Sequence, residues 1–147
     1  MFEKILYPTD FSDASKKALD YIKQLKGAGT KEVVVLHVID EKELESLLHH
    51  SEGGLTFEGD LGKIMEKNAE EGMKVIEDEL KKSGFMVKPR IEWGIPFRDI
   101  LKAEEEENVS VVVLGSHGKS CIAEMLLGSV SEKVVRKSNK PVLVVRR

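Results

Sequence analysis

The chain has 147 residues, of which 41% are hydrophobic and 33% charged, and its 23 basic and 26 acidic side chains give a formal charge of −3. This length is enough for a domain with a buried core, and the composition is that of an ordered globular protein rather than a disordered one. A net charge this small creates no strong field, so we expect no nucleic-acid partner.

The cysteine content and the hydropathy pattern bear on location. Cys121 is the only cysteine, so no intrachain disulfide can form, which suits a cytoplasmic protein. Residues 1–8 turn polar too soon for a signal peptide, and no apolar run approaches the roughly 18 residues needed to cross a bilayer. We therefore expect a cytoplasmic protein that does not enter a membrane.

The start of the chain predicts a strand followed by a helix. Residues 4–7 form a short apolar run that Pro8 stops, as at the end of a buried strand. Ser12 is placed to cap a helix whose apolar residues recur at helical spacing, and Gly27 and Gly29 would end that helix.

The next part predicts a second strand and two more helices. Residues 33–39 are apolar without alternation, which indicates a strand covered on both faces, as in a parallel sheet. Residues 41–48 fit a short helix, and an apolar stripe over residues 61–80 predicts a long one that Ser83 and Gly84 end.

A third strand and a fourth helix follow. Residues 86–93 alternate imperfectly, and Pro89 among them indicates a strand near a sheet edge. Pro96 is placed to open a helix with residues 100–101 facing inward. The acidic run 104–107 is interpreted as the solvated face of this helix.

The end of the chain completes the alternation of strands and helices. Residues 109–114 predict a buried strand, 115–119 a loop, 128–137 a helix and 141–145 a last strand. Strands alternating with helices predict a doubly wound α/β fold. With no repeat and no linker in the sequence, we expect residues 1–147 to form one domain.

A spaced glycine pattern follows the fourth predicted strand: Gly115-x2-Gly118-x9-Gly128-Ser129. Glycines let the backbone turn sharply and approach a ligand, and the exposed N–H groups of a turn or a helix start attract phosphate. The first two glycines alone would indicate only a turn, but the full pattern between a strand and a helix is more specific. It matches neither the P-loop nor the dinucleotide-binding fingerprint.

This glycine pattern, with residues 130–138 and the ending 141–145, resembles the universal stress protein family. The opening 5–12 and the strand segment 35–38 resemble that family too. The glycine motif is that of the family's ATP-binding branch. The resemblance implies an α/β fold like that of the adenine nucleotide alpha hydrolases: an open parallel five-stranded sheet of order 3-2-1-4-5 with helices on both faces.

The resemblance also implies which residues would bind ATP: Pro8, Thr9, Asp10, Val38, Leu114, Gly115, Gly118, Gly128, Ser129 and Val130. Asp10 would contact the ribose or adenine end, and the Val38 backbone would hold the adenine. Leu114 and Gly115 would line the floor of the pocket, and Gly118, Gly128, Ser129 and Val130 would bind the phosphates. The implied strand order agrees, since Asp10 and Gly115 follow strands 1 and 4, which meet at the switch point where such sheets bind ligands. The alternative is that Asp10 only caps a turn or the first helix.

Other polar residues carry weaker hypotheses. His117 would reach a phosphate or act as a base, or it is an exposed loop histidine. Lys119 neutralises phosphate or is solvated. His37 is interpreted as a packed, hydrogen-bonded histidine. His49-His50 with Glu52 is a poor metal site, because adjacent histidines rarely share one ion, and we expect no protein-held metal.

Catalytic groups for phosphoryl transfer are not evident, as the sequence has no Walker lysine, clear arginine finger or paired carboxylates beside the glycines. We expect an ATP-binding switch or sensor in a stress response, with Mg²⁺ or Mn²⁺ on the triphosphate. A slow, partner-dependent ATPase and a dimeric interaction module without functional nucleotide binding are the alternatives. The resemblance implies a homodimer formed through the last strands, and the sequence does not identify a protein partner.

Overall fold

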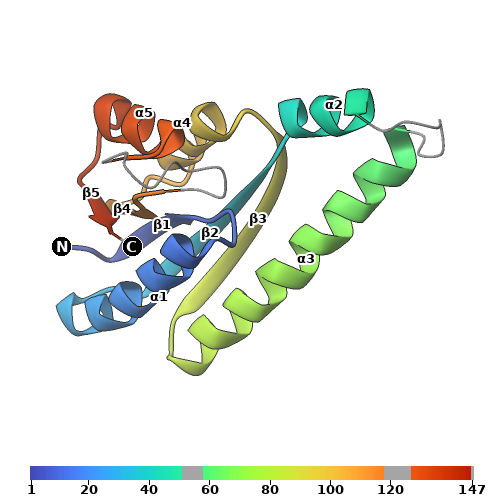
Figure 1. Cartoon of the computed structure of the whole chain (residues 1–147). Helices are drawn as coiled ribbons and strands as arrows, with labels where there is room; N and C mark the ends of the chain where they lie inside the picture. Colours follow the sequence, from blue (N-terminus) through green and yellow to red (C-terminus); the bar gives the residue numbers. More distant parts are fainter. Residues whose placement is uncertain (51–57, 118–126, 147) are drawn as a thin grey trace.

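The computed structural model describes residues 1–50, 58–117 and 127–146, with only the backbone for residues 50, 58 and 59. Its strands form a single parallel sheet of order β3-β2-β1-β4-β5 (Figure 1). The strands are β1 (Lys4–Pro8), β2 (Glu32–Asp40), β3 (Met86–Gly94), β4 (Val111–Gly115) and β5 (Val142–Val145). The α/β class and the strand order implied by the resemblance are therefore confirmed.

Helices cover both faces of this sheet, as predicted. They are α1 (Asp13–Leu25), α2 (Glu41–His50), α3 (Glu58–Lys82), α4 (Pro96–Glu106) and α5 (Ser129–Lys137), and a 3-10 turn (Lys26–Ala28) follows α1. One core cluster joins the sheet to α1 and α3, and a second joins it to α4 and α5. In Figure 1 these two helix pairs lie on opposite sides of the strands.

The two clusters follow from the alternation of side chains along each strand. In β1, Ile5 and Tyr7 belong to the cluster under α1 and α3, whereas Leu6 belongs to the cluster under α4 and α5. In β2, Val33 and Val34 divide in the same way, and both are fully buried. Because both of its faces are covered, β2 is apolar without a polar alternation, as the sequence predicted.

The helix ends lie close to the capping and turn residues from which they were predicted. The Ser12 hydroxyl accepts a hydrogen bond from the Ser15 N–H at the start of α1, and Pro96 occupies the first turn of α4. Gly29 and Gly84 have φ angles of 101° and 91°, the left-handed backbone that lets the chain reverse after α1 and α3.

Several element boundaries and one surface differ from the predictions. Pro8 is the last residue of β1, and Gly115 closes β4 instead of opening the loop. The predicted solvated acidic face over residues 104–107 is wrong at two positions. Glu104 is only 4% exposed, because its carboxylate accepts hydrogen bonds from the turn after α5, and the Glu107 side chain is only 8% exposed.

Glu107 is buried among cations from two strands. Its carboxylate lies 3.3 Å from the Lys4 ammonium, 2.7 Å from Lys88 and 3.1 Å from Arg90. Hydrogen bonding from Lys88, followed by that from Lys4, lowers the pKa of Glu107 from its ordinary value of 4.5, against the opposing effect of burial. This network ties the end of α4 to the start of β1 and to β3.

Within the described residues, no helix is long and apolar enough to traverse a lipid bilayer.

Replacing Glu107 with Gln should lower the free energy of unfolding at neutral pH by about 1–3 kcal/mol, because three cations lose their shared carboxylate. The folded-state pKa lies below 4.5, so the stabilisation is present above that pH and is lost as the pH falls through the folded-state value. Urea unfolding at several pH values should show the stabilities of the wild type and E107Q converging in acid.

The exposed neighbour Glu105, changed to Gln, is the matched control, and its free energy of unfolding should stay within about 0.5 kcal/mol of that of the wild type. A constant gap between wild type and E107Q at all pH values would contradict this assignment.

Candidate functional site

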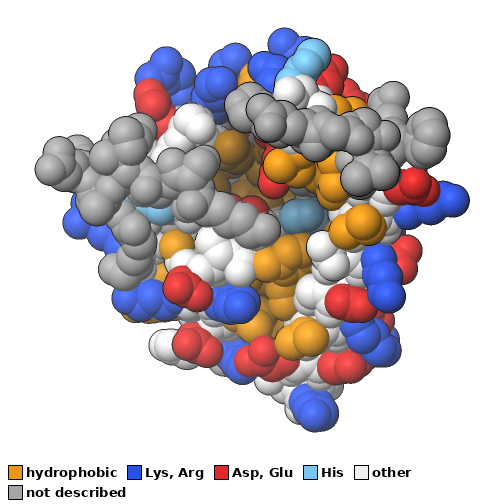
Figure 2. All heavy atoms as spheres, turned by 45° about the vertical axis from the view of Figure 1, so that its right-hand side comes forward, with side chains coloured by type: hydrophobic (Ala, Val, Ile, Leu, Met, Phe, Trp, Pro, Cys, Tyr) orange, Lys and Arg blue, Asp and Glu red, His pale blue; other side chains and the backbone are white. Residues whose placement is uncertain are grey.

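A cavity of about 400 Å³ opens beyond the carboxyl ends of β1, β2 and β4. Figure 2 shows the hollow, with hydrophobic side chains and a histidine in it. The described residues of the predicted site all line it: Pro8, Thr9, Asp10, Val38, Leu114, Gly115, Gly128, Ser129 and Val130. Gly118 lies outside the described residues. Segments distant in sequence thus meet around one space, as the strand order required.

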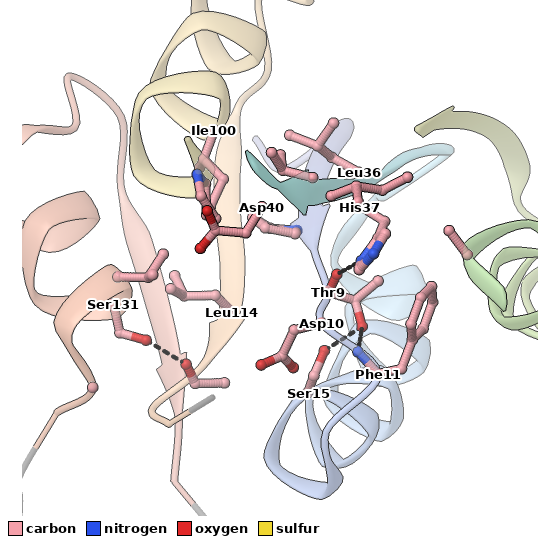
Figure 3. A pocket seen from close by; sticks show the side chains of 18 of the residues that line it. Thr9, Asp10, Phe11, Ser15, Leu36, His37, Asp40, Ile100, Leu114 and Ser131 are labelled. Carbon is pink, nitrogen blue, oxygen red and sulfur yellow. Dashed lines mark hydrogen bonds between the residues drawn. The ribbon is translucent and has the colours of Figure 1, made fainter. Parts of the chain in front are cut away.

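Thr9 fixes the wall that follows β1. Its N–H donates to the Leu36 carbonyl at 2.8 Å, and its own carbonyl lies 2.8 Å from the His37 ring nitrogen Nδ1. Its hydroxyl oxygen accepts from the Ser15 hydroxyl at 2.5 Å. His37 is therefore hydrogen-bonded and packed, as predicted, and Thr9 is held by groups from β2 and α1 (Figure 3).

Asp10 points its carboxylate into the cavity, toward the side from which Leu114 and Ser131 come (Figure 3). Its Oδ1 atom accepts a hydrogen bond from the Ser12 N–H at 3.0 Å, which closes a turn just before α1. The predicted alternative of a turn cap is therefore present. It does not compete with a ligand role, since a carboxylate has two oxygens and can accept several hydrogen bonds.

Tyr7 supports this loop from beneath. It is fully buried, and its phenol donates to the Ser15 carbonyl at 2.5 Å. Burial raises the pKa of Tyr7 above its ordinary value, so the phenol keeps its proton and remains a donor at neutral pH. The start of α1 is thereby fixed to the sheet at the edge of the cavity.

Gly115 allows β4 to approach α1 closely. A Cβ built at this position would lie 2.8 Å from the Ala14 carbonyl carbon and 2.9 Å from the Ser15 nitrogen, both backbone atoms. Gly115 therefore sets how closely β4 approaches the first turn of α1, and its carbonyl accepts from the buried Ser131 hydroxyl at 2.8 Å.

The start of α5 forms the opposite wall. Gly128 precedes its first turn and makes no side-chain cap, and its own N–H donates to the Ser116 carbonyl at 2.7 Å. Ser129 is exposed, and Val130 is half-buried. A helix start without a side-chain cap presents backbone N–H donors and a partial positive charge to an anion.

Two walls were not predicted. Glu43 of α2 and Met65, Asn68 and Ala69 of α3 line one side, and Pro96 and Ile100 of α4 line another. The apolar stripe that placed Met65 in a helix indicates packing as readily as a ligand wall. No sequence signal separates these two roles, because they use the same residue types.

Charge is distributed unevenly around the cavity. Its described lining contains three carboxylates, Asp10, Asp40 and Glu43, and no lysine or arginine. His117 also lines it, half-buried, with Nδ1 2.6 Å from the Ser116 hydroxyl. Lys119 lies outside the described residues. No group of three or more side chains suited to a metal ion occurs in the described part of the chain, where the predicted weak site of His49, His50 and Glu52 is only partly included.

Replacing Gly115 with Ala should lower the free energy of unfolding by about 1–3 kcal/mol, because the added methyl group meets backbone and not a movable side chain. Gly27→Ala is the matched control. It has no atom within 4 Å of the added Cβ, and it should stay within about 1 kcal/mol of wild type. Chemical denaturation measures both, and equal stabilities for the two variants would show that the close approach at Gly115 is unimportant.

Comparison with known proteins gives one consistent result. A universal stress protein from Methanocaldococcus jannaschii, MJ0577, is 46% identical, with 100% of this chain and 96% of the relative covered. The solved structure of MJ0577 superposes with a TM-score of 0.89 at 45% identity over 100% of this chain and 97% of that chain. The Bacillus subtilis universal stress protein YxiE is 36% identical over 99% of this chain and all of the relative.

More distant structures share the fold. They include a universal stress protein in complex with cAMP (TM-score 0.69, 23% identity). Another is an Arabidopsis thaliana family member with AMP bound (TM-score 0.69, 16% identity). These cover 99% and 98% of this chain, and 97% and 91% of their own chains. The model of the universal stress protein family matches residues 1–146, and this chain belongs to that family.

Proposed function

We propose that this protein binds ATP in the cavity at the switch point of the sheet and acts as a nucleotide-dependent switch or sensor. The observation that carries the proposal is the pairing of two unlike walls. The Asp10 carboxylate lies on one side, and the uncapped start of α5 at Gly128 lies on the other. A nucleotide has a matching asymmetry, with hydroxyl donors on its ribose and anionic oxygens on its phosphates.

The phosphate half of the proposed site uses backbone rather than charged side chains. Ser129 and Val130 belong to the first turn of α5, whose N–H groups lack intrahelical acceptors. Ser129 adds an exposed hydroxyl. Gly118 is proposed to add donors from the preceding loop. Such an anion site tolerates the absence of a lysine, because the helix start supplies partial positive charge.

The nucleoside half is proposed to lie against β1 and β2. Asp10 accepts hydrogen bonds from the ribose hydroxyls, and Val38 offers backbone groups to the adenine edge. Pro8, Thr9 and Leu114 provide the flanking surfaces. Neighbours of the same fold with cAMP and AMP bound support an adenine nucleotide as the ligand class.

The charge of the cavity supports a metal-bound form of the ligand. A triphosphate would enter a space lined by three carboxylates and, among described residues, by no lysine or arginine. A divalent cation such as Mg²⁺ or Mn²⁺, carried on the phosphate oxygens, would reduce this repulsion, and Mg²⁺ is usually held through few protein ligands.

A slow ATPase is the alternative function. His117 is the described lining residue best suited to move a proton, and it contacts the hydroxyl of Ser116. That hydroxyl belongs to a fully buried residue, so it is poorly placed to act as a nucleophile. Hydrolysis would need a positioned water and stabilisation of the transferring phosphoryl group, and the described lining offers no cationic side chain for that role.

Identifying the retained ligand tests the function directly. We propose that the protein acts in the cytoplasm. It is purified from a cell extract without denaturant, and the small molecules that it releases are identified by mass spectrometry. Intact ATP supports the switch. ADP, with steady phosphate release after ATP and Mg²⁺ are added, supports the ATPase. No retained adenine nucleotide and no binding in calorimetric titration would leave only the interaction module.

Replacing Asp10 with Ala should weaken ATP binding about tenfold to a hundredfold, the loss expected for hydrogen bonds to a charged acceptor. Calorimetric titration with ATP in the presence of Mg²⁺ measures the affinity. Removing the Mg²⁺ with a chelator should weaken ATP binding by the wild type as well. Asp13→Ala is the matched control, because Asp13 is exposed on the first turn of α1 and does not line the cavity. Equal affinities for the two variants would remove Asp10 from the proposed site.

We also propose a homodimer formed by pairing β5 across a two-fold axis. In the described part of the chain, β5 pairs with β4 on one side only, and Leu143 is 38% exposed. An apolar edge strand of this kind favours pairing with a second copy.

Leu143→Lys should raise the dimer dissociation constant at least about a hundredfold, because it places a charge in the centre of the proposed interface. Sedimentation velocity over a concentration series measures the effect. Val75→Lys, at a 66% exposed position on α3, should leave the assembly unchanged. A monomeric wild type at all concentrations would contradict the dimer.

A further inference from the structure

The residue after Asp10 has an unusual backbone conformation. Phe11 has a φ angle of 64°, the left-handed region that bulky side chains rarely adopt. Such a conformation costs free energy and persists only where the surroundings impose it, and it is most often found at functional sites. In this structure, the neighbours of Phe11 impose it.

The Phe11 ring is confined on two sides. It stacks on the His37 ring, with the ring centroids 4.4 Å apart and the planes inclined by 28°. It also lies so close to α3 that a Cβ built on Gly72 would be 2.9 Å from ring atoms. The Phe11 N–H donates to the Thr9 hydroxyl at 3.0 Å. Ring and backbone are thus held by β2, α3 and the end of the β1 wall.

This anchoring bears on the direction of the Asp10 carboxylate. The φ angle of Phe11 decides where the chain turns next, and therefore where the Ser12 N–H lies relative to Asp10. That N–H donates to Asp10 Oδ1 at 3.0 Å. In Figure 3 the carboxylate and the Phe11 ring point to opposite sides, one toward Ser131 and the other toward His37. The ring and the carboxylate are thus anchored on opposite sides of the same short turn.

We propose that Phe11 is the positioning residue of the nucleotide site: its anchored ring holds the left-handed turn that aims the Asp10 carboxylate into the cavity. The proposal rests on the proposed function for its effect on ATP affinity. The proposed effect of Phe11 on the turn does not rest on that function, because Phe11 acts on the orientation of Asp10 whether or not a nucleotide is present.

A double-mutant cycle tests the effect on affinity. Phe11→Leu should weaken ATP binding on the order of tenfold, as expected for loss of a group that orients a ligand-binding side chain. In the Asp10→Ala background the same change should alter affinity less than about twofold, because the residue it acts through is gone. Phe11 also lines the cavity, and a direct contact between its ring and the nucleotide would instead give the full loss in both backgrounds and overturn the proposal.

Phe2→Leu is the matched control, since Phe2 packs against the same core cluster as Phe11 but does not line the cavity. It should lower stability and leave ATP affinity unchanged. An equal loss of affinity in both leucine variants would mean that Phe11 acts only through general stability, which would also overturn the proposal.

Hydrogen exchange without nucleotide separates this proposal from the proposed function. Phe11→Leu should speed hydrogen exchange of the backbone amides at positions 11 and 12 at least about tenfold, because both amides donate within the turn. This increase should exceed any change in exchange that Phe2→Leu causes at the same two amides. If the wild type binds no ATP but these amides respond as described, the proposed function fails and the positioning role stands. Unchanged exchange at both amides overturns the positioning role, whatever ATP does.

Discussion

The position of β1 between β2 and β4 is the constraint on which the site depends. The chain leaves β1 toward the face covered by α1 and α3, whereas the chain after β4 reaches α5 on the opposite face. Two connections that leave neighbouring strands toward opposite faces leave a gap between them. The cavity occupies that gap, so its place follows from strand order before any side chain is considered.

Hydrogen bonds and close packing then give the gap its shape. Thr9 is tied to β2 and α1, the Tyr7 phenol holds the Ser15 carbonyl, and Gly115 lets β4 approach the first turn of α1. Each contact is local, yet together they join both sides of the cavity to the same buried strands. Because tightly packed cores resist small deformations, a site built this way is largely formed before a ligand arrives.

The sequence predicted features that depend on local chemistry or on a long pattern. The unalternating apolar run of β2, the cap at Ser12 and the helix start at Gly128 all lie where they were expected. Features that depend on which surfaces meet were missed. Glu104 was predicted to be solvated because an acidic run usually is, but the turn after α5 supplies hydrogen-bond donors that the local sequence does not indicate. The left-handed turn at Phe11 was equally hidden, since a phenylalanine gives no indication of a positive φ angle.

The residues missed and those predicted differ in how they would act on a ligand. Asp10 and the start of α5 were predicted because the proposed contacts with a nucleotide require particular groups: a carboxylate, a hydroxyl or a helix start with open N–H donors. A supporting residue is constrained by the shape of the space that it fills, and several residue types can fill the same space. The His37 ring illustrates this point. It was predicted as a packed histidine, and its packing against Phe11 and its bond to the Thr9 carbonyl connect it to the two residues that flank Asp10. The ligand role proposed for Asp10 requires directed hydrogen bonds, because an unfixed carboxylate in a cavity lined by carboxylates would add only repulsion; the rigidity of its neighbours is therefore part of that proposed role.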